Sequence, residues 1–204
     1  MSKEKQYSGK NGLAGLQALV QRGGESKKGL PPVELWNPDF CGDLDMVIKK
    51  DGTWFYMGTP IGRQPLVNLF ASVLRKDEDG KTYLVTPVEK IGITVEDAHF
   101  VAVEMNSHEE NGLPVLTFRT NVGDVVTVGP ENPLRFVTVE ENDGVKPYIL
   151  VRGRLEAVLA RAVMYELIAL GEEIEVDGHT MFAVQSKGEI YPIMAAETLA
   201  ELSK

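Results

Sequence analysis

Short apolar runs alternate with turn-forming dipeptides along most of the chain. Strands are predicted where Val, Ile, Thr and aromatic residues are enriched, and turns where Asp-Gly, Asn-Gly and Gly-Pro pairs follow them. The predicted strands are 45–49, 53–57, 82–85, 91–95, 100–105, 115–120, 125–128, 134–139, 148–151, 155–159, 174–176 and 180–184. Such regularly spaced short strands indicate mostly antiparallel sheets, curled into a half-barrel or a sandwich.

Helical spacing of apolar residues is found in four segments: 11–21, 64–75, 161–170 and 198–202. In the second of these, Leu66, Leu69 and Phe70 share one face, and Pro65 suits the first turn because its missing N–H is not needed there. Strands mixed with a few helices predict an α+β fold.

Two segments of the chain resemble each other. RQPLVNLFASVLRKDEDGKT (63–82) aligns without a gap to RAVMYELIALGEEIEVDGHT (161–180), and six of the twenty positions are identical. Average residue usage predicts about one or two identities. We interpret this as an internal duplication of a strand–strand–helix–strand unit, although any helix followed by a hairpin shares part of the pattern.

The pattern predicts three regions. Residues 1–30 form a basic helical arm with a linker, 31–92 a first α+β subdomain, and 93–204 a second subdomain that carries the second repeat. The first 30 residues contain six Lys and Arg and two Glu. We expect a solubilising arm that packs on the acidic body, or a helix that mediates dimerisation; contact with RNA or a membrane is the alternative.

Composition narrows the function classes. The net charge of −9 and the pI of about 4.9 argue against a nucleic-acid-binding surface, which needs clustered Lys and Arg. There is no apolar run long enough for a transmembrane helix and no signal-peptide core, and the single Cys41 excludes an internal disulfide. We therefore expect a cytoplasmic protein.

The best candidate ligand site is the loop formed by Gly58, Thr59, Pro60, Gly62 and Arg63. Its glycines permit close approach of the backbone to a ligand, and the loop opens a predicted helix whose N-terminus favours an anion. The arginine adds a fork suited to phosphate or carboxylate. This is not a Walker loop, because no Gly-Lys-Ser/Thr follows.

Arg161 stands at the start of the second predicted helix, in the position equivalent to Arg63 but without glycines. If the two helix starts face each other, they would form one composite and asymmetric anion site. The alternative is that Arg63 pairs with Glu89 or Asp45 and has a structural role.

A second candidate is the pair Asp43 and Asp45, which share a face of a predicted strand and could hold Mg²⁺. A role in a turn or cap is the favoured alternative. Cys41 lacks a CxxC partner or a histidine base, and the chain contains no nucleophile elbow and no zinc-binding histidine motif. Catalysis is therefore not predicted, and no cofactor can be named.

Three polar residues could line a pocket in the second subdomain. Asn121 lies in the segment Thr120–Asp124, which is typical of a tight turn but could read a base or sugar edge. Arg152 and Glu156 could form a cross-strand ion pair or face a ligand; the sequence leaves both interpretations open.

Several phrases then occur in order: PPVELWNPDFCGDLDM (31–46), DGTWFYMGTPIGR (51–63), LVTPVEKIGI (84–93), VEDAHF (95–100), TNVGD (120–124) and VRGRLEA (151–157). They resemble the bacterial domain-of-unknown-function family 1285, over roughly residues 30–195. His99 departs from the proline that the family pattern has there. The resemblance implies a fold of repeated motifs, with a C-terminal half similar to pleckstrin-homology half-barrels.

The resemblance also implies a nucleotide-like ligand at the subdomain interface and a role in signal transduction. Together with the 58–63 loop, it favours a regulatory module that binds a small anionic molecule. One alternative is a protein-interaction scaffold that uses a sheet edge and the N-terminal helix. Another is a metal-dependent phosphate hydrolase that uses Asp43 and Asp45.

Overall fold

The computed structural model describes residues 29–139 and 144–202, and it divides into two compact units. The first unit contains the described residues up to Lys49 together with Thr53–Glu96. The second contains Lys50–Gly52 and the described residues from Asp97 onward. The predicted helix 11–21 and nearly all of the basic arm lie outside the described residues.

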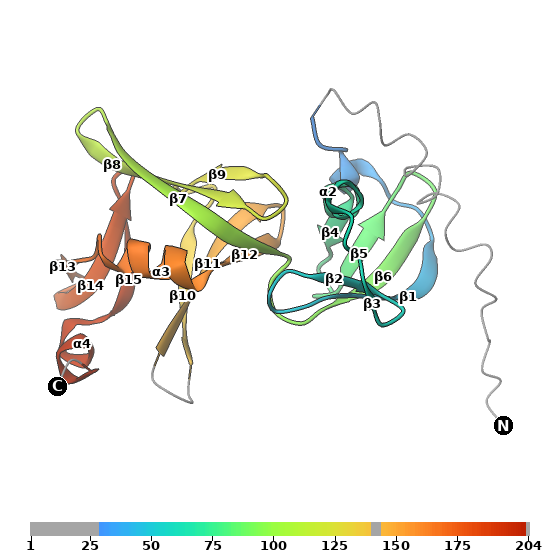
Figure 1. Ribbon diagram of the computed structural model, residues 1–204. Coiled ribbons are helices and arrows are strands. Elements are labelled where there is room, and N and C mark those ends of the chain that lie inside the picture. The colour runs from blue at the N-terminus through green and yellow to red at the C-terminus, as the bar shows by residue number, and fades with distance from the viewer. Residues whose placement is uncertain (1–28, 140–143, 203–204) are drawn as a thin grey trace. The chain divides into compact units, whose positions relative to one another are not determined.

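The first unit is built on one six-stranded sheet (Figure 1). Its elements are the 3₁₀ helix η1 (Val33–Leu35), β1 (Phe40–Ile48), β2 (Trp54–Tyr56), β3 (Thr59–Pro60), α2 (Gln64–Ser72), β4 (Leu74–Lys76), β5 (Thr82–Val85) and β6 (Lys90–Val95). The strand order is β3-β2-β1-β6-β5-β4. Strands β1 and β6 are parallel, and the other neighbours are antiparallel.

The core of the first unit lies on one face of this sheet. Ile48 and Leu84 are fully buried there, and the helix α2 turns Val67 and Phe70 inward. The Phe70 ring stacks on Trp54 of β2, with 6.1 Å between the ring centroids. Burial of the large apolar side chains removes them from water and accounts for most of the stabilisation of such a layer. The opposite face of the sheet carries polar and aromatic side chains.

The second unit contains a curled six-stranded sheet and a separate three-stranded sheet (Figure 1). Its elements are β7 (Phe100–Glu110), β8 (Leu113–Thr120), β9 (Val125–Thr127), β10 (Leu134–Val139), β11 (Gly144–Arg152), β12 (Leu155–Leu159), α3 (Arg161–Ile168), β13 (Glu172–Val176), β14 (His179–Ser186), β15 (Glu189–Ala195) and α4 (Ala196–Leu202). The strand orders are β10-β11-β12-β7-β8-β9 and β13-β14-β15. Only the pair β12–β7 is parallel among these neighbours.

A buried serine joins the two sheets of the second unit. Ser186, at the end of β14, accepts a hydrogen bond from the backbone N–H of Leu116 at 3.0 Å and donates one to the carbonyl of Val128 at 2.9 Å. Phe118 and Leu167 are fully buried in the same unit. The Ser186 hydroxyl therefore ties the three-stranded sheet to the larger sheet.

The fold is richer in strands than the predicted α+β class. The described residues contain fifteen strands, while the α-helices have only nine, eight and seven residues. The predicted helix 64–75 was too long, because the chain leaves α2 after Ser72 and Leu74–Lys76 pairs with β5 instead. The coarse prediction of strand-rich sheets with few helices is confirmed, but the architecture is closer to all-β with mixed sheets.

The two segments that align in sequence share a helix followed by a hairpin, but their surroundings differ. The hairpin β4–β5 belongs to the large sheet of the first unit, whereas β13–β14 belongs to a small separate sheet. Their turns differ too: Asp177 and Gly178 both have positive φ, whereas only Gly80 does in the first hairpin. The duplication is therefore not confirmed and stays a prediction, as does the likeness to pleckstrin-homology half-barrels.

Candidate functional site

The predicted ligand loop of the first unit begins with a tight turn. Met57 and Gly58 have φ of 48° and 73°, the left-handed pair typical of a two-residue hairpin turn, and they join β2 to β3. Just beyond β3, the N–H of Ile61 donates to the carbonyl of Trp54 at 2.7 Å. The loop from Gly58 to Arg63 is exposed except for Ile61, and the Met57–Gly58 turn and the Ile61 N–H hold its first part to β2.

The start of α2 offers an anion fewer donors than the sequence predicts. Pro65 has no N–H, and the N–H groups of Leu66 and Val67 both donate to the Arg63 carbonyl, at 2.9 and 3.2 Å. A helix N-terminus attracts anions mainly through N–H groups that lack such partners. Any anion bound here would depend on side chains, namely the Arg63 guanidinium and the Thr59 hydroxyl.

Arg63 differs from the other arginines that the structure describes. Its side chain is exposed, and no other described residue forms a hydrogen bond, ion pair or ring contact with it. The remaining described arginines are all engaged: Arg75, Arg119, Arg135, Arg152, Arg154 and Arg161. The alternative pairing of Arg63 with Glu89 or Asp45 is not observed among the described residues.

Arg161 is held against its own helix. Its Nε and Nη2 atoms donate to the hydroxyl of Tyr165 at 3.1 and 3.0 Å, and the guanidinium lies 5.6 Å from the centre of that ring. Both side chains are exposed. An incoming anion would have to compete with this contact, because each of the two hydrogen bonds uses an N–H that the anion would need.

The three predicted pocket residues of the second unit make contacts within the protein. The Oδ1 atom of Asn121 accepts a hydrogen bond from the N–H of Val101 at 3.0 Å, so its amide fixes the turn. Arg152 forms an ion pair with Asp124 and also lies over the Phe100 ring, 4.8 Å from its centre.

Glu156 accepts a pair of hydrogen bonds from Arg135. The Arg135 Nε and Nη2 atoms lie 2.5 and 2.8 Å from the two carboxylate oxygens. This two-pronged geometry is the strongest arrangement for an arginine and a carboxylate. Glu156 of β12 is therefore paired with Arg135 of β10, across the intervening strand β11, which is a cross-strand ion pair.

The candidate metal residues Asp43 and Asp45 both lie on β1 and are exposed. Asp43 lies over Gly92 of β6, with its Oδ1 atom only 2.0 Å from the position that a Cβ on Gly92 would take. The carbonyl of Asp45 accepts a hydrogen bond from Met57 at 2.9 Å. Within residues 29–139 and 144–202, no group of three His, Cys, Asp or Glu side chains could hold a metal ion.

Sequence reasoning missed a row of residues across the face of the first sheet that lies opposite Leu84. Arg75, Tyr83, Gly92 and Asp43 are direct register partners on β4, β5, β6 and β1. Arg75 is buried and donates to the carbonyls of Val33 and Trp36, which fixes the segment around η1 over the edge of the sheet. No signal in the sequence distinguishes this arginine, because the row exists only once the four strands pair.

Hydrogen bonds shift the pKa of Tyr83, a member of this row, and of Asp77, which lies beside Arg75. Burial raises the pKa of Asp77, but hydrogen bonds from Arg75 and Lys90 outweigh burial and bring it below its usual value. The hydroxyl of Tyr83 donates to Asp79 at 2.5 Å, and this bond, together with burial, raises the pKa of Tyr83 to about 12. Each of these polar groups forms a hydrogen bond with another member of the set, as expected for a network that stabilises the fold.

No helix within the described residues is long and apolar enough to cross a membrane.

Two models of one protein family match most of the chain. Residues 31–98 match the family model "Domain of unknown function (DUF1285), N-terminal domain", and residues 99–193 match "Protein of unknown function (DUF1285), C-terminal domain". No curated protein matches the chain.

Two solved structures are similar to the chain. A DUF1285 family protein from Silicibacter pomeroyi DSS-3 is 44% identical, with a TM-score of 0.79 over 89% of this chain and 97% of that one. A DUF1285 family protein from Shewanella baltica OS155 is 27% identical, with a TM-score of 0.49 over 61% of this chain and 90% of that one.

Proposed function

Because the chain belongs to the DUF1285 family and carries an exposed arginine, Arg63, whose side chain has no partner within the described residues, we propose that it is a regulatory module that binds a small anionic molecule. The ligand would be similar to a nucleotide in carrying phosphate groups. The expected role in signal transduction follows from the family resemblance and stays a prediction.

The observation that carries this proposal is the contrast between Arg63 and the other described arginines. A guanidinium left without a carboxylate partner retains its full capacity for a phosphate, which it can contact through two parallel N–H groups. The hydroxyl of Thr59 also lacks a partner within the described residues. The tight turn at Met57–Gly58 and the bond from Ile61 limit the movement of the loop between them, which reduces the entropic cost of binding.

The test is a thermal-shift series with the full chain, using pyrophosphate, a panel of nucleotides and a panel of phosphorylated metabolites. We expect at least one of these anions to raise the melting temperature of the wild-type protein, and Arg63→Ala to remove that increase. Arg119→Ala is the matched control, because Arg119 is also exposed but pairs with Glu104. Arg119→Ala should leave the increase unchanged.

A second variant tests whether Arg161, the residue that aligns with Arg63 in sequence, contributes to anion binding. If Arg161 contributes, as the sequence predicts, Arg161→Ala should weaken the same anion. If no anion stabilises the wild-type protein, the proposal is wrong and a protein-interaction scaffold becomes the better explanation. An anion effect that survives in the Arg63→Ala, Arg161→Ala double variant would show binding elsewhere, and would equally contradict the proposal.

A further inference from the structure

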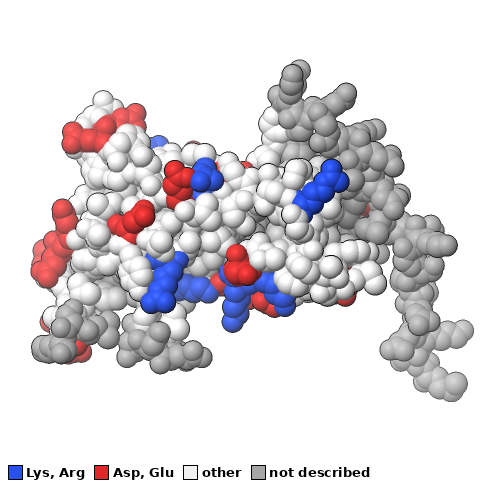
Figure 2. Space-filling model, viewed as in Figure 1, with Lys and Arg blue, Asp and Glu red and all other residues white. Residues whose placement is uncertain are grey.

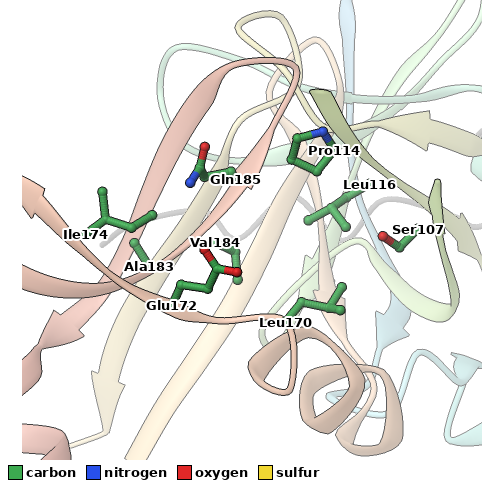
Figure 3. A pocket seen from close by; sticks show the side chains of 9 residues that line it. All are labelled: Ser107, Pro114, Leu116, Leu170, Glu172, Ile174, Ala183, Val184 and Gln185. Carbon is green, nitrogen blue, oxygen red and sulfur yellow. The ribbon is translucent and has the colours of Figure 1, made fainter. Parts of the chain in front are cut away.

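The second unit contains a cavity of about 190 Å³ that the sequence did not predict. It lies between the β7–β8 hairpin, the β13–β14 hairpin and the residue Leu170, just beyond α3 (Figure 3). Much of its wall is apolar, formed by Pro114, Leu116, Leu170 and Ile174. A cavity that combines an apolar wall with a few polar groups is the usual form of a small-molecule site.

Three polar side chains from three different strands line this cavity. They are Ser107 of β7, Glu172 of β13 and Gln185 of β14 (Figure 3). The structure shows no hydrogen bond or ion pair for any of these three side chains among the described residues. Other carboxylates of the unit, such as Asp124 and Glu156, are paired with arginines. The cavity therefore presents acceptor oxygens that no group of the described chain uses.

The charge around the cavity favours a cation. Glu172 is the charged residue in the lining, and neither Lys nor Arg lines the cavity. Glu109 pairs with Pro114 as Ser107 pairs with Leu116, so Glu109 stands on the same face of the hairpin, two residues further along. Figure 2 shows acidic side chains over the tip of the β7–β8 hairpin and over β13.

The composition of the unit points the same way. Residues 97–204 contain 18 Asp and Glu against 8 Lys and Arg, whereas residues 1–96 contain 12 against 13. The net negative charge of the chain therefore resides in the region that holds the cavity. Such a field raises the local concentration of small cations.

The size of the cavity is sufficient for a small ligand. Its volume is about 190 Å³. A primary amine on a four-carbon stem has five non-hydrogen atoms and fits that space. The ammonium group would donate to the Glu172 carboxylate, and the stem would contact the apolar wall.

We propose that this cavity binds an alkylammonium group, with Glu172 as its counter-ion. The group could belong to a free alkylamine or to a lysine side chain, because each presents an ammonium group on an alkyl stem. The site lies wholly within the second unit and does not include Arg63. The protein would therefore bind an alkylammonium group at this cavity in addition to the anion proposed above.

The test uses the full chain and n-butylammonium chloride as the probe. Binding is monitored through amide chemical shifts in NMR titrations at constant ionic strength. We expect saturable shifts in β7, β8, β13 and β14. Two probes of the same length serve as controls: n-butanol has the stem without the charge, and butyrate has the opposite charge. Both should bind at least tenfold more weakly than butylammonium.

The matched variants are Glu172→Gln and Glu173→Gln. The two residues are neighbours on β13, but Glu173 pairs with Phe182 and stands on the opposite face from the cavity. Glu172→Gln should weaken butylammonium at least tenfold, and Glu173→Gln less than twofold. Glu172 is exposed, so the exchange should leave the fold intact, which a melting curve checks.

Three outcomes would overturn the proposal: no saturable binding of butylammonium, equal binding of n-butanol, or equal losses in the two variants. Nα-acetyl-lysine amide distinguishes the two sources of the group. Binding as tight as that of butylammonium would support a lysine side chain of a peptide, and its exclusion would support a free amine. If no anion binds through Arg63, the results expected for butylammonium stay the same, so the two proposals can fail separately.

Discussion

Tyr83 and Asp79 show how one hydrogen bond sets the chemistry of two residues. The phenol donates to the carboxylate, which favours the neutral phenol and the ionised carboxylate together. The pKa of Tyr83 is raised to about 12, and the pKa of Asp79 is lowered by the same bond and by the N–H of Lys81. The sequence marked Asp79 only as part of a turn and of the two aligned segments, and it gave no signal for its bond with Tyr83.

The raised pKa predicts a loss of stability at high pH. Below pH 10 Tyr83 is neutral in both states, so the folded protein keeps its full stability there. Between about pH 10 and 12 the unfolded chain loses this proton and the folded protein retains it, so the free energy of unfolding should fall as pH rises. NMR of labelled tyrosine rings, with Tyr83→Phe for assignment, would measure the titration.

The Asp79→Asn variant is the control for this effect. Without the carboxylate, Tyr83 should titrate closer to its ordinary value of 10. A Tyr83 that already titrates near 10 in the wild-type protein would contradict the hydrogen bond.

Gly92 is required by its neighbour rather than by its backbone. A Cβ at this position would lie 2.0 Å from the Asp43 Oδ1 atom and 3.2 Å from its Cγ atom. Gly92→Ala should therefore displace the exposed Asp43 carboxylate and lower the free energy of unfolding of the first unit by about 1 kcal/mol or less. Urea unfolding would measure the change in the free energy of unfolding.

A double-mutant cycle separates this clash from other effects. In an Asp43→Ala background the cost of Gly92→Ala should nearly vanish, since the obstructing carboxylate is gone. A cost that is the same in both backgrounds would mean that the two residues do not touch.

At the scale of elements, Ser186 is the junction between the two sheets of the second unit. Its hydroxyl is fully buried and connects β14 to Leu116 of β8 and to Val128 just after β9. Ser186→Ala should lower the free energy of unfolding by about 2–3 kcal/mol, because a buried N–H and a buried carbonyl lose their partner. Chemical denaturation would measure this loss.

Ser107→Ala is the matched control for this prediction. Ser107 is exposed and makes no side-chain hydrogen bond within the described residues, so its removal should change the free energy of unfolding by less than about 0.5 kcal/mol. Equal losses of unfolding free energy in the two serine variants would contradict the role of Ser186 as a junction between the sheets.

Element types were predictable where one physical signal dominated. The Asn111-Gly112 turn has positive φ at both residues, as the dipeptide predicts for a two-residue hairpin. The end of α2 was not predictable in the same way. Val73 and Leu74 continue the apolar helical stripe in sequence, but backbone pairing of Leu74 with Leu84 makes this segment a strand. Strand pairing between distant residues outweighed local spacing.

At the scale of the whole molecule, the uneven charge has a consequence for stability. The excess of acidic residues lies in 97–204, while 1–96 is nearly neutral. Repulsion among like charges is screened by salt. Hydrogen exchange at low and at high NaCl concentration should therefore show amides of β7–β15 gaining protection with salt. Amides of β1–β6 should change little, and an equal gain in both regions would contradict the prediction.

The sequence by itself determined the family, the strand-rich character, the two-residue turns and the chemistry available to an exposed loop. These follow from local signals: residue types, their alternation and short phrases in a fixed order. It also identified Arg63 as a candidate, because an arginine beside glycines at a helix start is recognisable along the chain.

Only the tertiary structure decided which polar residues are occupied. Arg152, Glu156 and Asn121 looked as available as Arg63 in the sequence, yet each has a partner that lies at least 20 residues away along the chain. The cavity of Ser107, Glu172 and Gln185 arises in the same way, from strands that meet only after folding. Pairing across strands joins residues without regard to their separation in sequence, and local patterns carry no record of those pairings.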